Sequence, residues 1–283
     1  MKIATFRTPA GAVTYGVVRG DRVHDTGSLL AARHADLQAV IAADALAELD
    51  RCAGDAPWHA IADVQWLPPL PRPPKLVMIG LNYRAHQREL GLPEPKNPVV
   101  IARFANSQVG HGQPLVRPRA SVQFDYEGEL AVVIGRRARA VSEADALACV
   151  AGYACYMDGT VRDFQKHTSQ VTPAKSFPGT GAFGPWISTA GEVGDPNQLE
   201  LVTRLNGAEV QRTSTADMIW NVQQLVAYLS VFLELEPGDV ICTGTTSGVG
   251  SMRTPPLWLK AGDRVEVELQ AVGTLSNPVV DEA

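Results

Sequence analysis

The chain has 283 residues, 45% of them hydrophobic and 19% charged, as expected of a globular protein with one large domain or one large and one small domain. Its net charge of −5 argues against nucleic acid as a partner, because phosphate contacts need a basic surface. No apolar run approaches the roughly 18 residues that span a bilayer, and the first residues lack the apolar core of a signal peptide. We therefore expect a cytoplasmic protein with no membrane partner.

Residues 1–70 are predicted to form a small α/β module. Two strand patterns, residues 1–7 and 12–18, precede a stretch rich in Ala and Leu, residues 28–49. Apolar residues recur there three and four positions apart, which predicts helices. Five prolines then fall within residues 68–74, and such a run fits neither a helix nor a central strand. We place the boundary in this connector, with a larger domain at residues 71–283.

The larger domain is predicted to be rich in strands with few helices. Residues 76–79 and 130–134 are short apolar runs, and residues 265–269 alternate strictly between apolar and charged side chains, as in a half-exposed strand. One amphipathic helix is predicted at residues 221–232. These patterns place the chain in the α+β class.

The most informative segment combines two glutamates with the start of a strand. Glu127 and Glu129 are two residues apart, so in a strand they point to one face about 7 Å apart, within reach of one ion. Gly128 leaves the opposite face open to a close neighbour. Asp158, after another apolar run, supplies a third carboxylate, and oxygen ligands of this kind favour Mg²⁺ or Mn²⁺ over Zn²⁺. The alternative is a solvated acidic face. Asp125 is expected to face the other way and is left out.

Two basic residues and an amide follow this third carboxylate. Arg162 and Gln165 are three positions apart, hence on one face if the segment is helical. Arg162 offers a planar fork to a carboxylate, whereas Gln165 can both donate and accept hydrogen bonds. Lys175 would add a positive charge beside an oxyanion. Taken singly, each is expected more often at a surface, in a weak ion pair.

A histidine and a glutamate near the start of the larger domain form a possible acid–base pair. His86 and Glu89 are three positions apart, on one side of a helical turn. A carboxylate raises the basicity of imidazole and fixes its tautomer, which makes a base able to activate water. Gly80 and Gly91 flank the segment, so it could move as a lid. The alternative is an exposed pair on a loop helix.

Short motifs follow one another in a fixed order along residues 75–282. They are GLNYRAHQRE (80–89), DYEGELAVVIG (125–135), AGY (151–153) followed by Asp158, RDFQ (162–165), KSF (175–177), GPW (184–186), NG (206–207), LEPGDVI (235–241), TGT (243–245), GVG (248–250), GD (262–263) and GTLSNP (273–278). In this order they resemble the fumarylacetoacetate hydrolase family.

The resemblance implies a mixed β-roll catalytic domain of the α+β class, paired as a homodimer, behind a variable N-terminal module. It implies Mg²⁺ or Mn²⁺ on Glu127, Glu129 and Asp158. The expected substrates are small 2-oxo or 1,3-dioxo acids, chelated to the metal through their oxo-acid end.

The resemblance also implies roles for individual residues. In hydrolytic members, the positions of His86 and Glu89 form the dyad that activates water, and the position of Lys175 helps to hold the substrate and the leaving enolate. The residues expected to orient the substrate are Arg162, Gln165 and Thr245. Two positions depart from the family pattern, Met157 in place of Asn and Thr246 in place of Pro, and they put the identity of the substrate in doubt.

The leading hypothesis is a hydrolase that cleaves a C–C bond of an acylpyruvate-like acid to pyruvate and a carboxylic acid. The alternative is a decarboxylase, lyase or dehydratase of a related 2-oxo or sugar acid at the same metal site. A metal-stabilised protein that binds an organic acid without turnover is disfavoured, because neither the dyad nor the ligand positions are damaged.

Overall fold

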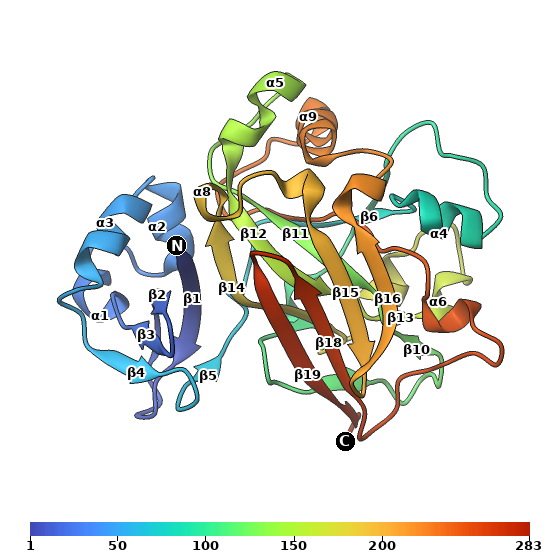
Figure 1. Cartoon of the computed structure of the whole chain (residues 1–283), viewed down its shortest axis with the longest axis horizontal. Coiled ribbons are helices and arrows are strands. Elements are labelled where there is room, and N and C mark those ends of the chain that lie inside the picture. The colour runs from blue at the N-terminus through green and yellow to red at the C-terminus, as the bar shows by residue number, and fades with distance from the viewer.

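The computed structural model describes all of residues 1–283. The first part of the chain forms four antiparallel strands with three short helices, at the left of Figure 1. The strands are β1 (Lys2–Arg7), β2 (Val13–Arg19), β3 (Arg22–His24) and β4 (Trp58–Ala60), and the helices are α1 (Gly27–Leu30), α2 (Leu37–Ala42) and α3 (Leu46–Cys52). Both predicted strands are present, but the predicted helical stretch is interrupted. Asp44, which has a positive φ of 53°, separates α2 from α3.

One large sheet runs from these first strands into the rest of the molecule. β1 pairs antiparallel with β14, with Lys2 opposite Ser188 and Ile3 opposite Ile187. Beyond β1 the sheet order is β14 (Gly181–Thr189), β12 (Val150–Met157), β11 (Gly128–Ile134), β17 (Val240–Cys242), β6 (Leu76–Gly80) and β7 (Val99–Ala102), with β5 (Gln65–Trp66) paired to β1 and β8 (Gln108–Val109) to β14. The boundary at residues 70 and 71 stays a prediction.

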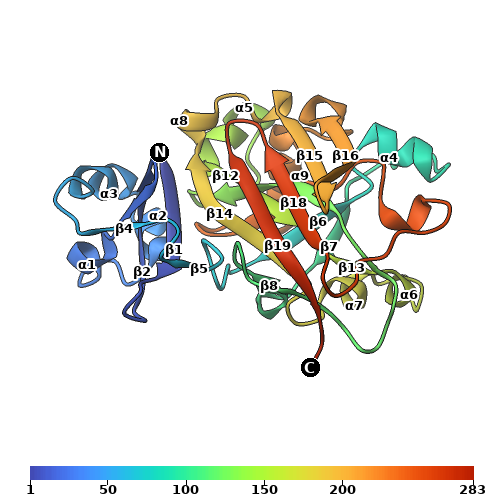
Figure 2. The same ribbon diagram turned by 60° about the horizontal axis from the view of Figure 1, so that its bottom comes forward.

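A second sheet covers one face of the first (Figures 1 and 2). Its strands, in order, are β16 (Ala208–Ser214), β15 (Glu200–Leu205), β18 (Arg264–Leu269), β19 (Gly273–Asp281) and β9 (Leu115–Arg117), and a separate pair joins β10 (Phe124–Asp125) to β13 (Thr160–Val161). The remaining helices are α4 (Arg84–Glu89), α5 (Glu143–Ala146), α6 (Arg162–Gln165), α7 (Thr172–Lys175), α8 (Ala190–Val193) and α9 (Val222–Phe232). The expected α+β class dominated by strands is confirmed. No helix is both long and apolar enough to cross a membrane.

The predicted amphipathic helix, α9, is confirmed, and its start is fixed by local chemistry. The side chain of Asn221 accepts the N–H of Gln224 at 2.9 Å, and the side chain of Gln224 accepts the N–H of Asn221 at 3.0 Å. This reciprocal cap satisfies two backbone donors that the first turn leaves free. Leu225 and Leu229, four apart on one face, are buried in the main core.

The alternation of β11 divides its side chains between two environments. Leu130 and Val132 lie in the core shared with the second sheet, whereas Ala131 and Val133 lie in a core shared with β6 and the first strands of the chain. Gly128 faces the second sheet so closely that a Cβ there would lie 2.0 Å from the Oγ1 of Thr203. A glycine is therefore required, as the sequence predicts, and the residues on either side of it face away from the second sheet.

Candidate active site

The three predicted carboxylates converge because β11 and β12 are antiparallel neighbours. Gly128, at the start of β11, pairs with Met157, at the end of β12, so Glu127 and Asp158 are adjacent. The N–H of Asp158 donates to the carbonyl of Glu127 at 2.8 Å. Glu127, Glu129 and Asp158 are only 5%, 2% and 1% exposed. The alternative of a solvated acidic face is therefore wrong.

This cluster fits one hard divalent cation. One oxygen from each of Glu127, Glu129 and Asp158 lies within 4.8 Å of the others. Oxygens at about 2.1 Å from a shared ion are at most about 4.2 Å apart, so small side-chain shifts would bring all three to it. Three carboxylates without His or Cys suit Mg²⁺ or Mn²⁺ better than Zn²⁺.

Two buried cations already balance part of this negative charge. The Nζ of Lys175, at the end of α7, contacts Glu127 at 2.6 Å and the Oγ1 of Thr160 at 2.7 Å, and also bonds to Asp158. The Nη2 of Arg162, at the start of α6, lies 2.6 Å from Glu127. Both side chains are buried, so the expectation of exposed surface pairs is wrong.

The pKa values of the two glutamates are shifted in opposite directions. Burial raises the pKa of Glu127, but the positive charges of Lys175 and Arg162 outweigh it and lower the pKa to about 2. Burial raises the pKa of Glu129 well above its ordinary value, and the charges of Asp158 and Glu127 raise it further. One backbone donor, the N–H of Gly244 at 2.9 Å, contacts the Glu129 carboxylate. A divalent cation would supply the positively charged neighbour that the Glu129 carboxylate lacks.

The predicted dyad forms on α4. The Nδ1 of His86 lies 2.8 Å from the Oε2 of Glu89, and the Oε1 of Glu89 accepts the N–H of Gly248 at 2.8 Å. Burial raises the pKa of Glu89, but the hydrogen bonds with His86 and Gly248 outweigh it and hold the pKa below its ordinary value. The ionised carboxylate can only accept, so in the neutral imidazole the proton lies on Nδ1 and Nε2 is the acceptor. His86 is buried, so the alternative of an exposed pair is wrong.

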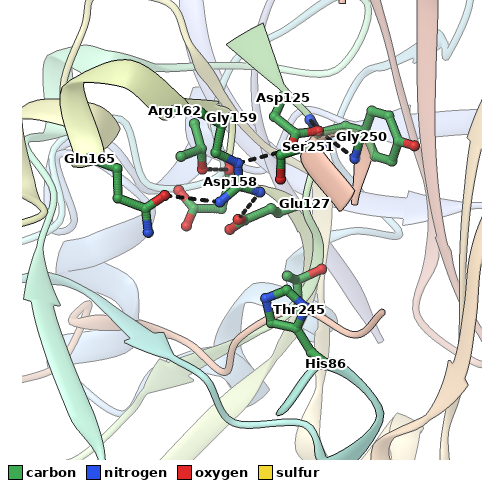
Figure 3. A network of polar contacts seen from close by, with 12 residues as sticks. His86, Asp125, Glu127, Asp158, Gly159, Arg162, Gln165, Thr245, Gly250 and Ser251 are labelled. Carbon is green, nitrogen blue, oxygen red and sulfur yellow. Dashed lines mark hydrogen bonds and ion pairs between the residues drawn. The ribbon is translucent and has the colours of Figure 1, made fainter. Parts of the chain in front are cut away.

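The predicted residues share one small cavity of about 180 Å³. Its polar lining consists of His86, Glu127, Glu129, Asp158, Arg162, Gln165, Lys175 and Thr245, with Glu89 behind His86. Figure 3 shows His86 and Thr245 across an open space from Glu127 and Gln165. The Oε1 of Gln165 accepts a hydrogen bond from Arg162 at 3.2 Å. The imidazole of His86, the three-carboxylate cluster and the cationic side chains of Arg162 and Lys175 therefore face one volume.

Asp125 lies outside the carboxylate cluster, as expected, but it belongs to the polar network around it. Its Oδ2 accepts a hydrogen bond from the Nε of Arg162 at 2.8 Å, and the N–H groups of Gly250 and Ser251 donate to the same carboxylate. Figure 3 shows Asp125 beside Gly250 and Ser251. β10 ends at Asp125 and β11 begins at Gly128, so the two segments are not one strand. Alternation along a single strand therefore gives no guide to the direction of the Asp125 side chain.

Arg103 and Gln211 also support the site, and the sequence gives no signal for either. Arg103 is fully buried and bonds to Asp158, to Ser107 at 2.8 Å and to Thr180 at 2.9 Å. The side chain of Gln211 accepts the N–H of Gly128 at 3.0 Å and donates to the Oγ1 of Thr245 at 2.9 Å. Gln211 thus joins the strand of the glutamates to the loop after β17.

The two departures from the family pattern lie next to this network. Met157 is buried in the main core, and its neighbour Asp158 is held by Arg103 and Lys175. Thr246 is fully buried, and its carbonyl accepts a hydrogen bond from Gln211 at 3.1 Å. Their effect on substrate choice stays a prediction.

Comparison with known proteins places this arrangement in a family. The family model for the C-terminal domain of fumarylacetoacetate (FAA) hydrolase matches residues 75–280. The chain belongs to the fumarylacetoacetate hydrolase family. A curated relative, the mitochondrial oxaloacetate tautomerase FAHD2A of Homo sapiens, is 40% identical over 221 residues, which cover 77% of this chain and 70% of the relative.

Solved structures of the family match the fold over its full length. Fumarylacetoacetate hydrolase from Exiguobacterium antarcticum is 33% identical with a TM-score of 0.88, and each chain is covered completely. Maleylpyruvate hydrolase from a Sphingobium species, solved with manganese(II) and pyruvate, is 28% identical with a TM-score of 0.84, again with complete coverage of both chains. Hydrolases and tautomerases thus occur among the chain's relatives.

Proposed function

We propose that the chain is a Mg²⁺- or Mn²⁺-dependent hydrolase that cleaves an acylpyruvate to pyruvate and a carboxylic acid. The observation that carries the proposal is the His86–Glu89 dyad, which faces the carboxylate cluster across one small cavity. A base paired with a cation site is the combination that attack of water on a polarised dioxo acid requires. The manganese- and pyruvate-bound relative adds support.

The chain's residues would divide the reaction between them. A divalent ion on Glu127, Glu129 and Asp158 would polarise the 2-oxo group of the substrate. His86 takes a proton from water through Nε2, and Glu89 stabilises the imidazolium that results. The water oxygen bonds to the distal carbonyl carbon, and the C–C bond to the pyruvate methylene breaks with its electron pair on the pyruvate side. His86 returns the proton to that carbon.

The remaining polar residues would hold the substrate and its developing charge. Lys175 places an ammonium group beside Glu127 and Asp158, where negative charge develops on the departing pyruvate enolate. Arg162 and Gln165 lie on one side of the cavity and Thr245 on the other, so they would orient the acid between them.

A second candidate is keto–enol tautomerisation of a 2-oxo acid. The 40% identical human relative, named as an oxaloacetate tautomerase, favours it. Tautomerisation needs no attack by water and no C–C cleavage: a base removes the proton of the enol hydroxyl, and a proton is delivered to the carbon next to the oxo group. The same dyad and cation site would suffice, so product analysis must separate the two reactions.

The test is a product assay with acetylpyruvate, fumarylpyruvate and oxaloacetate, each with Mn²⁺, with Mg²⁺ and with EDTA. Hydrolysis predicts pyruvate plus acetate or fumarate in a 1:1 ratio, lost with EDTA. Enol-to-keto conversion of oxaloacetate without C–C cleavage would favour the tautomerase. Loss of CO₂ from oxaloacetate would point to a decarboxylase, and no turnover of the whole panel would overturn the proposal.

A matched pair of histidine variants controls for indirect effects. We expect His86→Asn to lower kcat about 10²–10⁴-fold, the usual contribution of a general base. His34 makes a similar contact with Glu48, at 3.4 Å, in the N-terminal part of the chain. His34→Asn should leave kcat within a factor of two of the parent protein. Equal losses in both variants would contradict a role for the dyad.

A further inference from the structure

We infer that the substrate tail, the part beyond the oxo-acid head, is an uncharged aliphatic group. This inference rests on the proposed function, because it takes the head to be bound at the carboxylate cluster. It concerns the opposite end of the same cavity. Oxaloacetate and maleylpyruvate, named for two relatives, each carry a second carboxylate, so the inference separates this chain from those substrates.

Part of the cavity wall is apolar and comes mainly from elements other than those that carry the carboxylates. The carboxylates lie at the ends of β11 and β12, whereas the apolar wall comes from β6, from β7 and from the segments after α4 and before α7. In the sheet order, β6 and β7 lie beyond β17, on the side of β11 away from β12. The apolar residues that line the cavity are Met78, Ile79, Leu81, Leu90, Leu92, Val99, Ile101 and Val171.

The apolar wall packs closely over β6 at Gly80. Gly80 on β6 pairs with Val99 on β7, and a Cβ on Gly80 would lie 3.3 Å from Val99 Cγ1 and 3.4 Å from Ile101 Cδ1. A side chain at Gly80 would crowd these branched carbons, so the wall leaves little spare space there. The whole cavity is small beside the roughly 300–1,000 Å³ of sites for drug-sized ligands, so the tail is short.

The cations that line the cavity are already engaged at the other end. Lys175 contacts Glu127, Asp158 and Thr160, and Arg162 contacts Asp125 and Glu127. The two arginines of α4 do not line the cavity. Arg84 donates to the carbonyl of Met218 at 2.5 Å, and Arg88 is largely exposed near Asp217.

Charge balance leads to the same conclusion. The lining holds three acids and two permanent cations. With a divalent ion and the carboxylate of the substrate head, these charges cancel at full ionisation. A second carboxylate on the tail would lie beside aliphatic side chains without a cationic partner, and even partial desolvation of an unpaired charge is unfavourable.

The experiment compares ligands that differ only at the tail. 2-Oxohexanoate and 2-oxoadipate differ only in a terminal methyl or carboxylate group, and their dissociation constants are measured by calorimetry on the Mn²⁺-loaded protein. Kinetics use acetyl-, butanoyl- and hexanoylpyruvate beside succinylpyruvate. We expect 2-oxohexanoate to bind at least 10-fold more tightly than 2-oxoadipate. We also expect kcat/KM to rise about fourfold per added methylene until the cavity is full.

Two neighbouring valines on β7 provide matched variants. Val99 lines the cavity and is 40% exposed, whereas Val100 does not line it and is 37% exposed. Val99→Lys should shift the preference toward 2-oxoadipate by about 10-fold, because it adds a cation for the tail carboxylate. Val100→Lys should leave the preference unchanged.

The outcomes separate this inference from the proposed function. Turnover of succinylpyruvate with tighter binding of 2-oxoadipate would overturn the inference and leave the hydrolase standing. Binding that favours 2-oxohexanoate, without hydrolysis of any acylpyruvate, would support the inference and overturn the hydrolase. No binding of either 2-oxo acid would overturn both.

Discussion

The Nε of Arg162 donates to the Oδ2 of Asp125 at 2.8 Å, in a pair from which water is almost entirely excluded. Arg162 contacts Glu127 through a different nitrogen, at 2.6 Å. Asp125 also accepts the N–H groups of Gly250 and Ser251. Asp125, which lies outside the cavity, therefore holds both Arg162 in the cavity wall and the loop that contains Gly250 and Ser251.

Removing the charge of Asp125 should weaken this arrangement. We predict that Asp125→Asn lowers the free energy of unfolding by about 3–5 kcal/mol, as expected when one partner of a buried ion pair is lost. We also predict that kcat/KM falls about 10–100-fold, because Arg162 loses its support. Urea denaturation and steady-state kinetics measure the two effects. Asp163, which bonds to Ser121 at 2.8 Å and is less buried, is the matched control, and Asp163→Asn should change kcat/KM less than threefold.

The carboxylate cluster was predictable because its signals are local in sequence. Glu127 and Glu129 stand at the start of an apolar strand, and the antiparallel neighbour of that strand ends just before Asp158. The dyad was predictable for a similar reason, since helical spacing alone brings His86 to Glu89. Residue spacing within one helix or strand, or across two paired strands, directly predicts which side chains lie close together in the folded protein.

The supporting residues were not predictable because their partners are far away in the chain. Arg103 reaches Asp158 across 55 positions and Thr180 across 77. Gln211 reaches Gly128 across 83 positions. No periodicity encodes such contacts. The interruption of the predicted helical stretch at Asp44 was missed for a different reason: the apolar pattern continues through a residue with positive φ.

We expect Lys175 to stabilise negative charge on the reacting substrate and not to be needed for binding of the divalent ion. It contacts Glu127 and Asp158, two of the three residues of the cation site. We predict that Lys175→Met lowers kcat about 10²–10³-fold, the usual cost of one lost donor to a developing oxyanion. The dissociation constant for Mn²⁺ should not rise, because the variant removes a positive charge that competes for the same oxygens.

Mn²⁺ titration of the Lys175→Met protein, followed by calorimetry, measures this second effect. Lys75 is also paired with two carboxylates, Glu236 and Asp239, but lies outside the cavity. Lys75→Met should therefore leave both kcat and Mn²⁺ affinity unchanged. A Lys175→Met protein that no longer binds Mn²⁺ would show that the lysine builds the cation site.

The charge of Glu89 should stabilise the fold above its ordinary pKa. Hydrogen bonds with His86 and Gly248 hold the pKa of Glu89 below its ordinary value of about 4.5 in the folded protein. The unfolded chain then binds more protons as pH falls through that value, so this stabilisation is present above pH 4.5 and is lost below it. Melting temperatures of the parent protein and of Glu89→Gln should therefore converge between about pH 5 and 3. A constant difference over this range would contradict the prediction.

Glu129 should have the opposite effect in protein without a divalent ion. Burial, together with the charges of Asp158 and Glu127, raises its folded pKa well above its ordinary value of 4.5. The folded protein then binds a proton that the unfolded chain releases above pH 4.5, so the contribution of Glu129 to stability falls as pH rises. In EDTA, the melting temperature of Glu129→Gln relative to the parent protein should increase between about pH 5 and 8. Each 1 kcal/mol gained raises the melting temperature by about 2–4 °C. Glu143→Gln, at an exposed position in α5, should show no such trend.

Saturating Mn²⁺ should reverse the order of the two melting temperatures and place the parent protein above Glu129→Gln. The parent protein gains stability from the bound ion, whereas the variant lacks one of its three ligands. A Glu129→Gln protein that Mn²⁺ stabilises as much as it does the parent would exclude this carboxylate from the cation site.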